Sequence, residues 1–182
     1  MTYPQTLEWL YAQLPMFQRT GPVRYRLDLS KTLGLCNALG HPEKGLQVIH
    51  IAGTNGKGSV SHAVAAALQA RGLKVGLSTS PHLEDPRERI RVNGTCISES
   101  DFVAFVADNM KVWRTWEPSF FEVMFTMGLD AFRKAEVDVA VVETGMGGRW
   151  DSSTSFPAPL VTAIPSIGMD HQQFLGNDLR SI

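Results

Sequence analysis

The stretch Val48–Val60 reads V-I-H-I-A-G-T-N-G-K-G-S-V, and it decides the fold of this chain. The apolar run at 48–52 predicts a buried strand, three glycines then break the pattern, and the apolar spacing at 60–68 predicts a helix. A strand, a glycine loop and a helix together place backbone N–H groups and a helix N-terminus around a phosphate chain. The stretch therefore predicts a phosphate-binding loop.

We expect different roles for the different residues of this loop. Glycines let the backbone turn tightly and approach a ligand closely. Lys57 supplies a positive charge for the outer phosphates, and Ser59 supplies a hydroxyl for Mg²⁺. The usual pattern G-x-x-x-x-G-K-[ST] lacks the glycine that stands here between lysine and serine. The alternative is a glycine-rich turn without a ligand. The residues that we expect to bind the nucleotide are Gly53, Thr54, Asn55, Gly56, Lys57, Gly58 and Ser59.

A second strand is expected at Lys74–Thr79. Strand, helix and strand within roughly thirty residues form a βαβ unit, so we expect parallel pairing of 48–52 with 74–79. Ligands of such folds bind beyond the carboxyl ends of the strands. This rule places Ser80 on the same rim as the glycine loop.

A third strand is expected at Val137–Val142, a nearly all-apolar run that is typical of a central parallel strand. Glu143 follows it directly, where a phosphate-binding enzyme carries its metal-side acid. Burying this carboxylate unpaired would be costly, so we expect a cation partner. The alternative partner is Arg149, in a salt bridge.

The other elements fit around this frame. Helical patterns are expected at 4–18, at 31–39 and from Ser98 to before Pro118, with a hairpin about Asn93-Gly94 and a strand at 160–164. Ser119 and Glu122 form a capping box that starts a further helix, which runs to about Lys134. The predicted fold is α/β, a mostly parallel sheet flanked by helices as in P-loop NTPases.

Composition narrows the class of protein. The chain has 182 residues, of which 43% are hydrophobic and 19% charged, as in a globular domain. A formal net charge of −1 with scattered Lys and Arg argues against nucleic acid and for small-molecule partners. Two cysteines without C-x-x-C spacing indicate neither a disulfide framework nor a zinc site. Without a signal-peptide pattern or an apolar run of about 20 residues, we expect a cytoplasmic protein with no membrane contact.

Four motifs in order resemble one enzyme family. They are A-G-T-N-G-K-G-S at 52–59, S-P-H-L at 80–83, V-E-T-G-M-G-G-R-W-D at 142–151 and S-I-G-M-D-H at 166–171. Together they resemble folylpolyglutamate synthase and dihydrofolate synthase, of the Mur ligase superfamily, from about Leu39 onward. The resemblance implies an ATP-dependent ligase that adds L-glutamate to the carboxylate of dihydropteroate or a reduced folate through an acyl phosphate.

The resemblance also implies roles for single residues. The implied catalytic residues are Lys57, Glu143 and His171, with ATP and Mg²⁺ as cofactors. The implied Mg²⁺ ligands are Ser59, Ser80, Glu143 and His171. The implied substrate contacts are Phe120, Phe121, Glu122 and Asp151. Each has a structural alternative: Ser80 as a turn cap, Glu122 as a helix cap and His171 as an ordinary loop histidine.

The sequence departs from the family at one turn. Where the family continues with L-D-A-T-N, this chain has Trp150-Asp151-Ser152-Ser153-Thr154.

We expect residues 1–182 to be part of an ATP-binding Mur-ligase-like domain, the front portion of a longer enzyme that is monomeric. The rest of that domain and a C-terminal glutamate-binding domain would lie outside the chain, so we expect it to be inactive alone. The alternatives are a muramyl-peptide ligase of the same superfamily and a non-catalytic nucleotide-binding module. The sequence does not choose between dihydropteroate and tetrahydrofolate.

Overall fold

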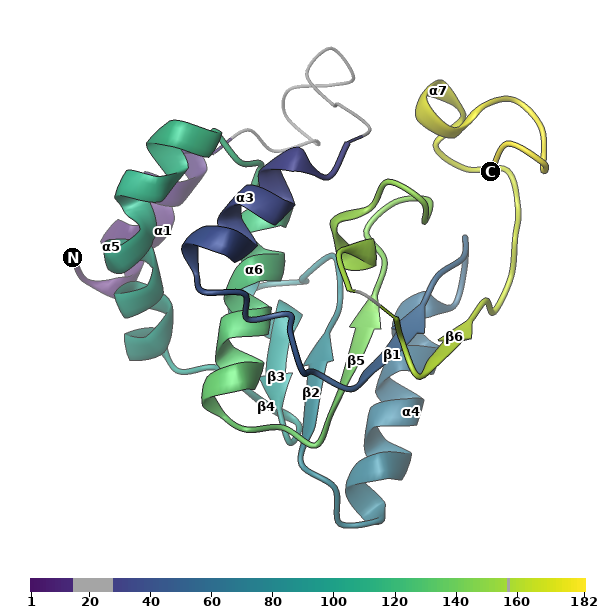
Figure 1. Cartoon of the computed structure of the whole chain (residues 1–182), viewed down its shortest axis with the longest axis horizontal. Coiled ribbons are helices and arrows are strands. Elements are labelled where there is room, and N and C mark those ends of the chain that lie inside the picture. Colours follow the sequence, from purple (N-terminus) through teal and green to yellow (C-terminus); the bar gives the residue numbers. More distant parts are fainter. Residues whose placement is uncertain (15–27, 157) are drawn as a thin grey trace.

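A computed structural model describes residues 1–14, 28–156 and 158–182. Its centre is a six-stranded sheet in the order β4-β3-β2-β5-β1-β6 (Figure 1). Strands β1, β2, β5 and β6 are parallel, and β3 and β4 extend the sheet as an antiparallel hairpin. The strands are β1 Val48–Ile51, β2 Val75–Ser78, β3 Ile90–Val92, β4 Thr95–Cys96, β5 Val139–Glu143 and β6 Val161–Ala163. The predicted α/β fold with a mostly parallel sheet is confirmed.

Helices cover both faces of this sheet. Helix α4 (Lys57–Ala70) packs on β1, β2 and β5, whereas α6 (Phe120–Lys134) packs on β2 and β3 from the other side. Outside α6 lie α3 (Ser30–Ala38) and α5 (Glu99–Trp116), and α1 (Tyr3–Gln13) packs on α5 (Figure 1). The short elements are α7 (Gln172–Leu175) and two 3₁₀ helices, η2 (Pro86–Arg89) and η3 (Ser152–Thr154). The helix expected at 4–18 is found as α1, and the residues after 14 in that range lie outside the described part.

Strand β5 occupies the middle of the sheet. Val139 and Val141 belong to the core under α4, and Ala140 and Val142 belong to the core under α6. Because both faces are covered, the strand needs the nearly continuous apolar run seen in the sequence. One expectation is corrected here: β1 and β2 are parallel but not paired with each other, because β5 lies between them. The βαβ rule sets the direction of its two strands and not their adjacency.

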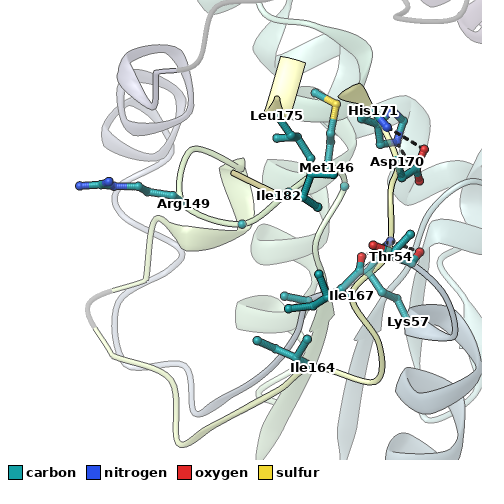
Figure 2. A pocket seen from close by; sticks show the side chains of 15 residues that line it. Thr54, Lys57, Met146, Arg149, Ile164, Ile167, Asp170, His171, Leu175 and Ile182 are labelled. Carbon is teal, nitrogen blue, oxygen red and sulfur yellow. Dashed lines mark hydrogen bonds and ion pairs between the residues drawn. The ribbon is translucent and has the colours of Figure 1, made fainter. Parts of the chain in front are cut away.

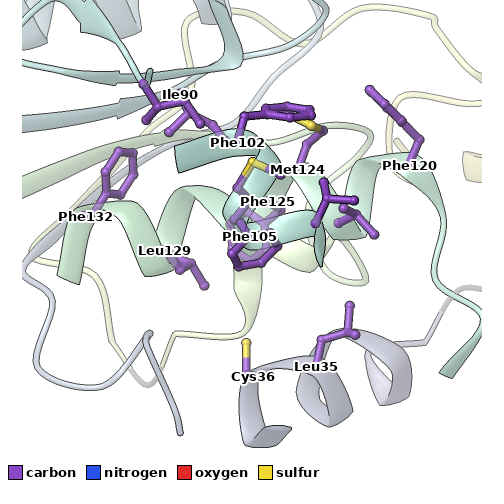
Figure 3. Close-up of a cluster of buried hydrophobic side chains, with 14 of the residues drawn as sticks. Leu35, Cys36, Ile90, Phe102, Phe105, Phe120, Met124, Phe125, Leu129 and Phe132 are labelled. Carbon is purple, nitrogen blue, oxygen red and sulfur yellow. The ribbon is translucent and has the colours of Figure 1, made fainter. Parts of the chain in front are cut away.

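The larger core lies between the sheet and the layer of α1, α3, α5 and α6 (Figure 3). Helix α6 dominates it with an almost unbroken buried run from Val123 to Asp130. The predicted capping box starts this helix: the Glu122 backbone N–H donates to Ser119 Oγ, and the Ser119 N–H donates to Glu122 Oε2 at 2.6 Å. At the other end, the ring of Phe132 lies directly over Gly76 of β2, where a Cβ atom would sit 2.6 Å from the ring.

The outer edge of the sheet is β6, whose neighbourhood is unusually apolar for a surface. Leu160, Val161 and Ile164 are each more than half exposed.

The helices of the described residues include none with both the length and the apolar character needed to cross a bilayer.

Candidate functional site

The glycine loop joins the end of β1 to the start of α4. Helix α4 begins at Lys57, one turn earlier than the apolar pattern indicates, so Lys57, Gly58 and Ser59 form its first turn. Gly56 is the N-cap with φ of +83°, a left-handed conformation that favours glycine. First-turn N–H groups have no partner within the helix and lie at its positive end. This geometry suits a phosphate.

The front of the loop is tied to the segment after β6. Gly53 has φ of +131°, and a Cβ there would lie 2.7 Å from the carbonyl oxygen of Ser166. The Thr54 N–H donates to the Ser166 carbonyl at 2.8 Å, and the Asn55 N–H donates to Ser166 Oγ at 3.1 Å. The Thr54 hydroxyl also bonds both the N–H and the carbonyl of Gly168. Of the expected nucleotide-binding residues, Thr54 and Asn55 thus hold the 166–168 segment, and their contact with a nucleotide stays a prediction.

Lys57 lines a pocket between the loop and the two segments that face it (Figure 2). Its ammonium group donates to the carbonyls of Gly53, at 2.8 Å, and of Thr54, at 3.2 Å. The lysine side chain thus folds back over its own loop, and its ammonium group lies close to the loop backbone. The pocket is lined by residues 52–54, 57, 145–149, 164, 167, 170, 171, 175 and 182.

Glu143 stands at the carboxyl end of β5 and is 5% exposed. Its Oε2 accepts a hydrogen bond from the Ser80 N–H at 3.2 Å, and a Cβ on Gly58 would lie 3.6 Å from the same oxygen. Burial raises the pKa of the carboxyl above its usual value, against the opposing effects of the Ser80 N–H and of Lys57. The structure thus brings Glu143, Ser80 and the first turn of α4 together.

The alternative salt bridge from Glu143 to Arg149 is not present. The Arg149 side chain points away from the pocket (Figure 2), with its guanidinium 5.6 Å from the ring centre of Trp150. Glu143 forms no ion pair with any residue of the described ranges. The buried carboxylate therefore has neighbouring positive charges at Lys57 and Arg89 but no direct cationic partner among these residues.

His171 lies in the segment that follows β6. It is the N-cap of α7, 3.7 Å from the Asp170 carboxylate, and it lines the same pocket as Lys57 (Figure 2). Glu143, Ser59 and Ser80 do not line that pocket. Within residues 1–14, 28–156 and 158–182, no three His, Cys, Asp or Glu side chains are close enough together to hold a metal ion. The four expected Mg²⁺ ligands are brought together only in part, and their role stays a prediction.

Asp151 is almost fully buried, at 1% exposure. Its Oδ2 accepts the Met146 N–H at 2.9 Å, and its Oδ1 accepts the Ser153 hydroxyl at 2.6 Å. Since the Ser153 proton goes to Asp151, His50 Nε2 is the donor to Ser153 Oγ, at 2.8 Å. The carboxylate therefore braces the 145–149 wall of the pocket from inside. Contact between Asp151 and a substrate stays a prediction.

Two of the residues that depart from the family motif at 150–154, Ser152 and Ser153, form buried hydrogen bonds. Ser153 stands where the family has threonine, so the hydroxyl that bonds Asp151 is kept. Ser152, in place of alanine, accepts a hydrogen bond from the buried Thr32 hydroxyl at 2.8 Å. This contact joins the turn to α3.

The three remaining candidates lie at the start of α6. The Phe120 ring is buried against Tyr11, at 5.7 Å between ring centres, and the Arg89 guanidinium lies 5.3 Å from its centre. Phe121 packs on Gly145 of the pocket wall, and Glu122 is engaged in the capping box. The structural explanation of Glu122 is therefore correct as far as it goes. Substrate contact by Phe120, Phe121 and Glu122 stays a prediction.

Sequence reasoning missed His50 and the anchoring role of Asp85. The signal for His50 was a single imidazole inside an otherwise apolar strand, which requires a buried hydrogen-bond partner. For Asp85 the local pattern Asp85-Pro86-Arg87-Glu88 indicates a capping residue, but no local pattern shows that Asp85 also accepts the hydroxyl of Tyr3, 82 residues earlier.

Comparison with known proteins agrees with the fold and the loop. No family model matches the chain. The dihydrofolate synthase/folylpolyglutamate synthase of Mycobacterium tuberculosis is 39% identical to this chain, in an alignment that covers 91% of this chain and 36% of that protein. The folylpolyglutamate synthase of Lacticaseibacillus casei is 36% identical and matches all of this chain but 42% of its own length. The chain spans less than half the length of these curated relatives.

Solved structures give the same result. A solved complex of FPGS (folylpolyglutamate synthase) with AMPPCP and folate superposes on this chain with a TM-score of 0.88 at 33% identity. The match covers the whole of this chain and 44% of the FPGS chain. Mycobacterium tuberculosis folylpolyglutamate synthase with ADP gives a TM-score of 0.84 at 37% identity, over 97% of this chain and 39% of the other. From the ordered motifs, the shared fold and these identities, the chain belongs to the folylpolyglutamate synthase/dihydrofolate synthase family.

Proposed function

We propose that this chain carries the phosphate-binding part of an ATP-dependent ligase that joins L-glutamate to the carboxylate of a pteroate or folate. The observation that supports it most is the first turn of α4 with Lys57, set beside the buried Glu143. The relatives named above include FPGS in complex with AMPPCP and folate. Residues 1–182 would form part of the ATP-binding domain, and further sequence would supply the rest of that domain and a glutamate-binding domain.

The reaction is an amide synthesis in two steps. The substrate carboxylate oxygen forms a bond to the γ-phosphorus of ATP as the bond to ADP breaks, which gives an acyl phosphate. The amine of glutamate then forms the C–N bond, loses a proton, and phosphate leaves. The first step brings two anions together, so it requires positioning and charge neutralisation more than covalent help. Lys57 and the first-turn N–H groups of α4 would supply both.

The residues present fit Mg²⁺. Glu143 is buried without a direct cationic partner in the described part of the chain, and Ser59 and Ser80 add the hard oxygen donors that Mg²⁺ prefers. Mg²⁺, when bound, neutralises charge on the phosphates. His171, which lines the same pocket as Lys57, would help to hold a second Mg²⁺. Phe120 and Phe121 would contact the flat heterocycle, and Glu122 and Asp151 would hold the walls around it.

The test uses the longer protein proposed above, which contains residues 1–182. Phosphate release is followed with Mg-ATP and glutamate, with dihydropteroate in one series and tetrahydrofolate in the other. Release with either supports the proposal and identifies the preferred substrate. We expect Lys57→Ala to abolish release, whereas Lys111→Ala, an exposed lysine on α5, should leave it unchanged.

If phosphate is released with neither substrate, the proposal is refuted. Release with a muramyl peptide would then favour the other branch of the superfamily, and tight ATP binding without any release would favour a nucleotide-binding module. We further propose a cytoplasmic monomer without nucleic-acid or membrane partners, which size-exclusion chromatography and cell fractionation would check.

A further inference from the structure

The loop between β2 and β3, residues 79–89, is built around one carboxylate. Glu88 accepts hydrogen bonds from three successive backbone N–H groups, those of Leu83 and Glu84 at 3.0 Å and of Asp85 at 2.8 Å. These bonds hold the turn compact although the Leu83 side chain is 91% exposed. The loop therefore has a fixed internal shape, and its position depends on how that shape is attached.

The attachment is at Asp85. This residue caps η2 through the Arg87 N–H, and its carboxylate forms a forked pair with the Arg87 guanidinium, with Nη2 to Oδ2 at 2.9 Å. Its Oδ1 also accepts the hydroxyl of Tyr3 on α1 at 2.7 Å. The Arg87 guanidinium lies 4.8 Å from the centre of the Tyr3 ring and 3.6 Å from Glu99 at the start of α5. Two helices thus hold one loop.

The charges make this attachment durable at neutral pH. Burial favours protonation of Asp85, but hydrogen bonds from Arg87 and Tyr3 outweigh it and lower the pKa of the carboxyl to about 2. Burial and the Asp85 charge raise the pKa of the Tyr3 hydroxyl well above its usual value. Asp85 therefore stays ionised and Tyr3 stays a donor.

Both ends of the loop reach the candidate site. At one end the Ser80 N–H donates to Glu143. At the other, the partly buried Arg89 donates from Nε to His82 Nδ1 at 2.7 Å, and its guanidinium lies over the Phe120 ring. A shift of the loop would move Ser80 and Arg89 together. We propose that Tyr3 is a positioning residue that fixes the 79–89 loop against the site, with Asp85 as the intermediary. The consequence for substrate rests on the proposed function.

The first test needs only this chain. In Tyr3→Phe the ring keeps its edge-on contact with Phe102, 5.3 Å between centres, and only the hydroxyl is lost. Amide hydrogen exchange at Leu83, Glu84 and Asp85 should accelerate by about tenfold, the effect of losing one hydrogen bond to a charged group. Thr6→Val is the matched control, because it removes a buried α1 hydroxyl that bonds only within the helix. Exchange in this control should equal that of the wild type.

Because Tyr3 acts through Asp85, and Asp85→Ala removes the acceptor of the Tyr3 hydroxyl, Asp85→Ala and the double variant Tyr3→Phe/Asp85→Ala should show the same exchange as each other. Unchanged loop exchange in Tyr3→Phe overturns the proposal, and so does additive acceleration in the double variant. In the longer protein we expect Tyr3→Phe to raise the KM for the pterin substrate severalfold with little change in kcat. An unchanged KM overturns the link to substrate. If the wild type turns over neither substrate, the proposed function fails, while hydrogen exchange still decides the role of Tyr3.

Discussion

Replacing Gly76 by alanine should destabilise the protein, although alanine normally suits a strand interior better than glycine by about 0.5–1 kcal/mol. The reason is the Phe132 ring, three of whose atoms would lie 2.6, 2.7 and 2.9 Å from the new Cβ. Carbon atoms do not approach so closely, and overpacking of this kind costs about 1–3 kcal/mol. Subtracting the gain leaves a net loss of about 0–2.5 kcal/mol, with a midpoint slightly above 1 kcal/mol. For a chain of this size a loss of about 1 kcal/mol lowers the melting temperature by about 2–4 °C.

Gly128→Ala is the matched control. Gly128 lies within α6, and a Cβ there would meet Ile90 at 3.6–3.9 Å, which is ordinary van der Waals contact. Helix propensity then favours alanine by about 1 kcal/mol, so this variant should melt a few degrees higher. Thermal unfolding followed by circular dichroism compares the two. If Gly76→Ala were as stable as the wild type or more so, the close packing of β2 on Phe132 would be refuted. In the double variant Gly76→Ala/Phe132→Leu, a smaller side chain replaces the ring. Its loss of unfolding free energy should be smaller than the sum of the losses in the two single variants.

Three further predictions test other parts of the structure. Lys57→Ala should weaken Mg-ATP binding by about 10–100-fold, since a charged hydrogen-bond donor is lost; wild-type affinity by titration calorimetry would contradict the assignment of the loop. Burial lowers the pKa of His50, against the opposing attraction of Asp151. The folded chain then binds a proton less readily than the unfolded chain, so stability should fall as pH drops below about 6.5. His50→Gln should flatten that fall in urea unfolding, and an equally steep fall would exclude His50 as its source. Ser119→Ala should cost about 1 kcal/mol, because the capping box of α6 is lost; a change within error would mean that other contacts start the helix.

The features that sequence predicts well here are local. The capping box of Ser119 and Glu122, the Asn93-Gly94 hairpin turn and the apolar run of β5 each depend on residues a few positions apart, and each is found. Local backbone preferences and burial periodicity determine them. The layout of strand, glycine loop and helix at 48–70 belongs to this class, apart from the start of the helix, which a pattern of apolar residues cannot place within one turn.

The features that sequence did not predict depend on contacts between distant residues. Thr54 bonds to Gly168 through two hydrogen bonds and Ser152 to Thr32 through one, and contacts of this kind leave no periodic trace in the chain. A family motif indicates Asp151, but the motif does not show that Ser153 joins this buried carboxylate to His50, about 100 residues earlier in the chain. The strand order likewise depends on where the crossover helices pack, and a βαβ pattern alone does not show that β5 separates β1 from β2.

This strand order has a consequence for how the protein forms during synthesis. The loop at 53–59 is contiguous, yet β1 and β2, on either side of α4, share no hydrogen bonds with each other. Both depend on β5, so the frame of the loop can assemble only after residue 143 has left the ribosome. Until then the apolar strands β1 and β2 lack their common neighbour, a nascent state that is prone to aggregate and to need chaperones.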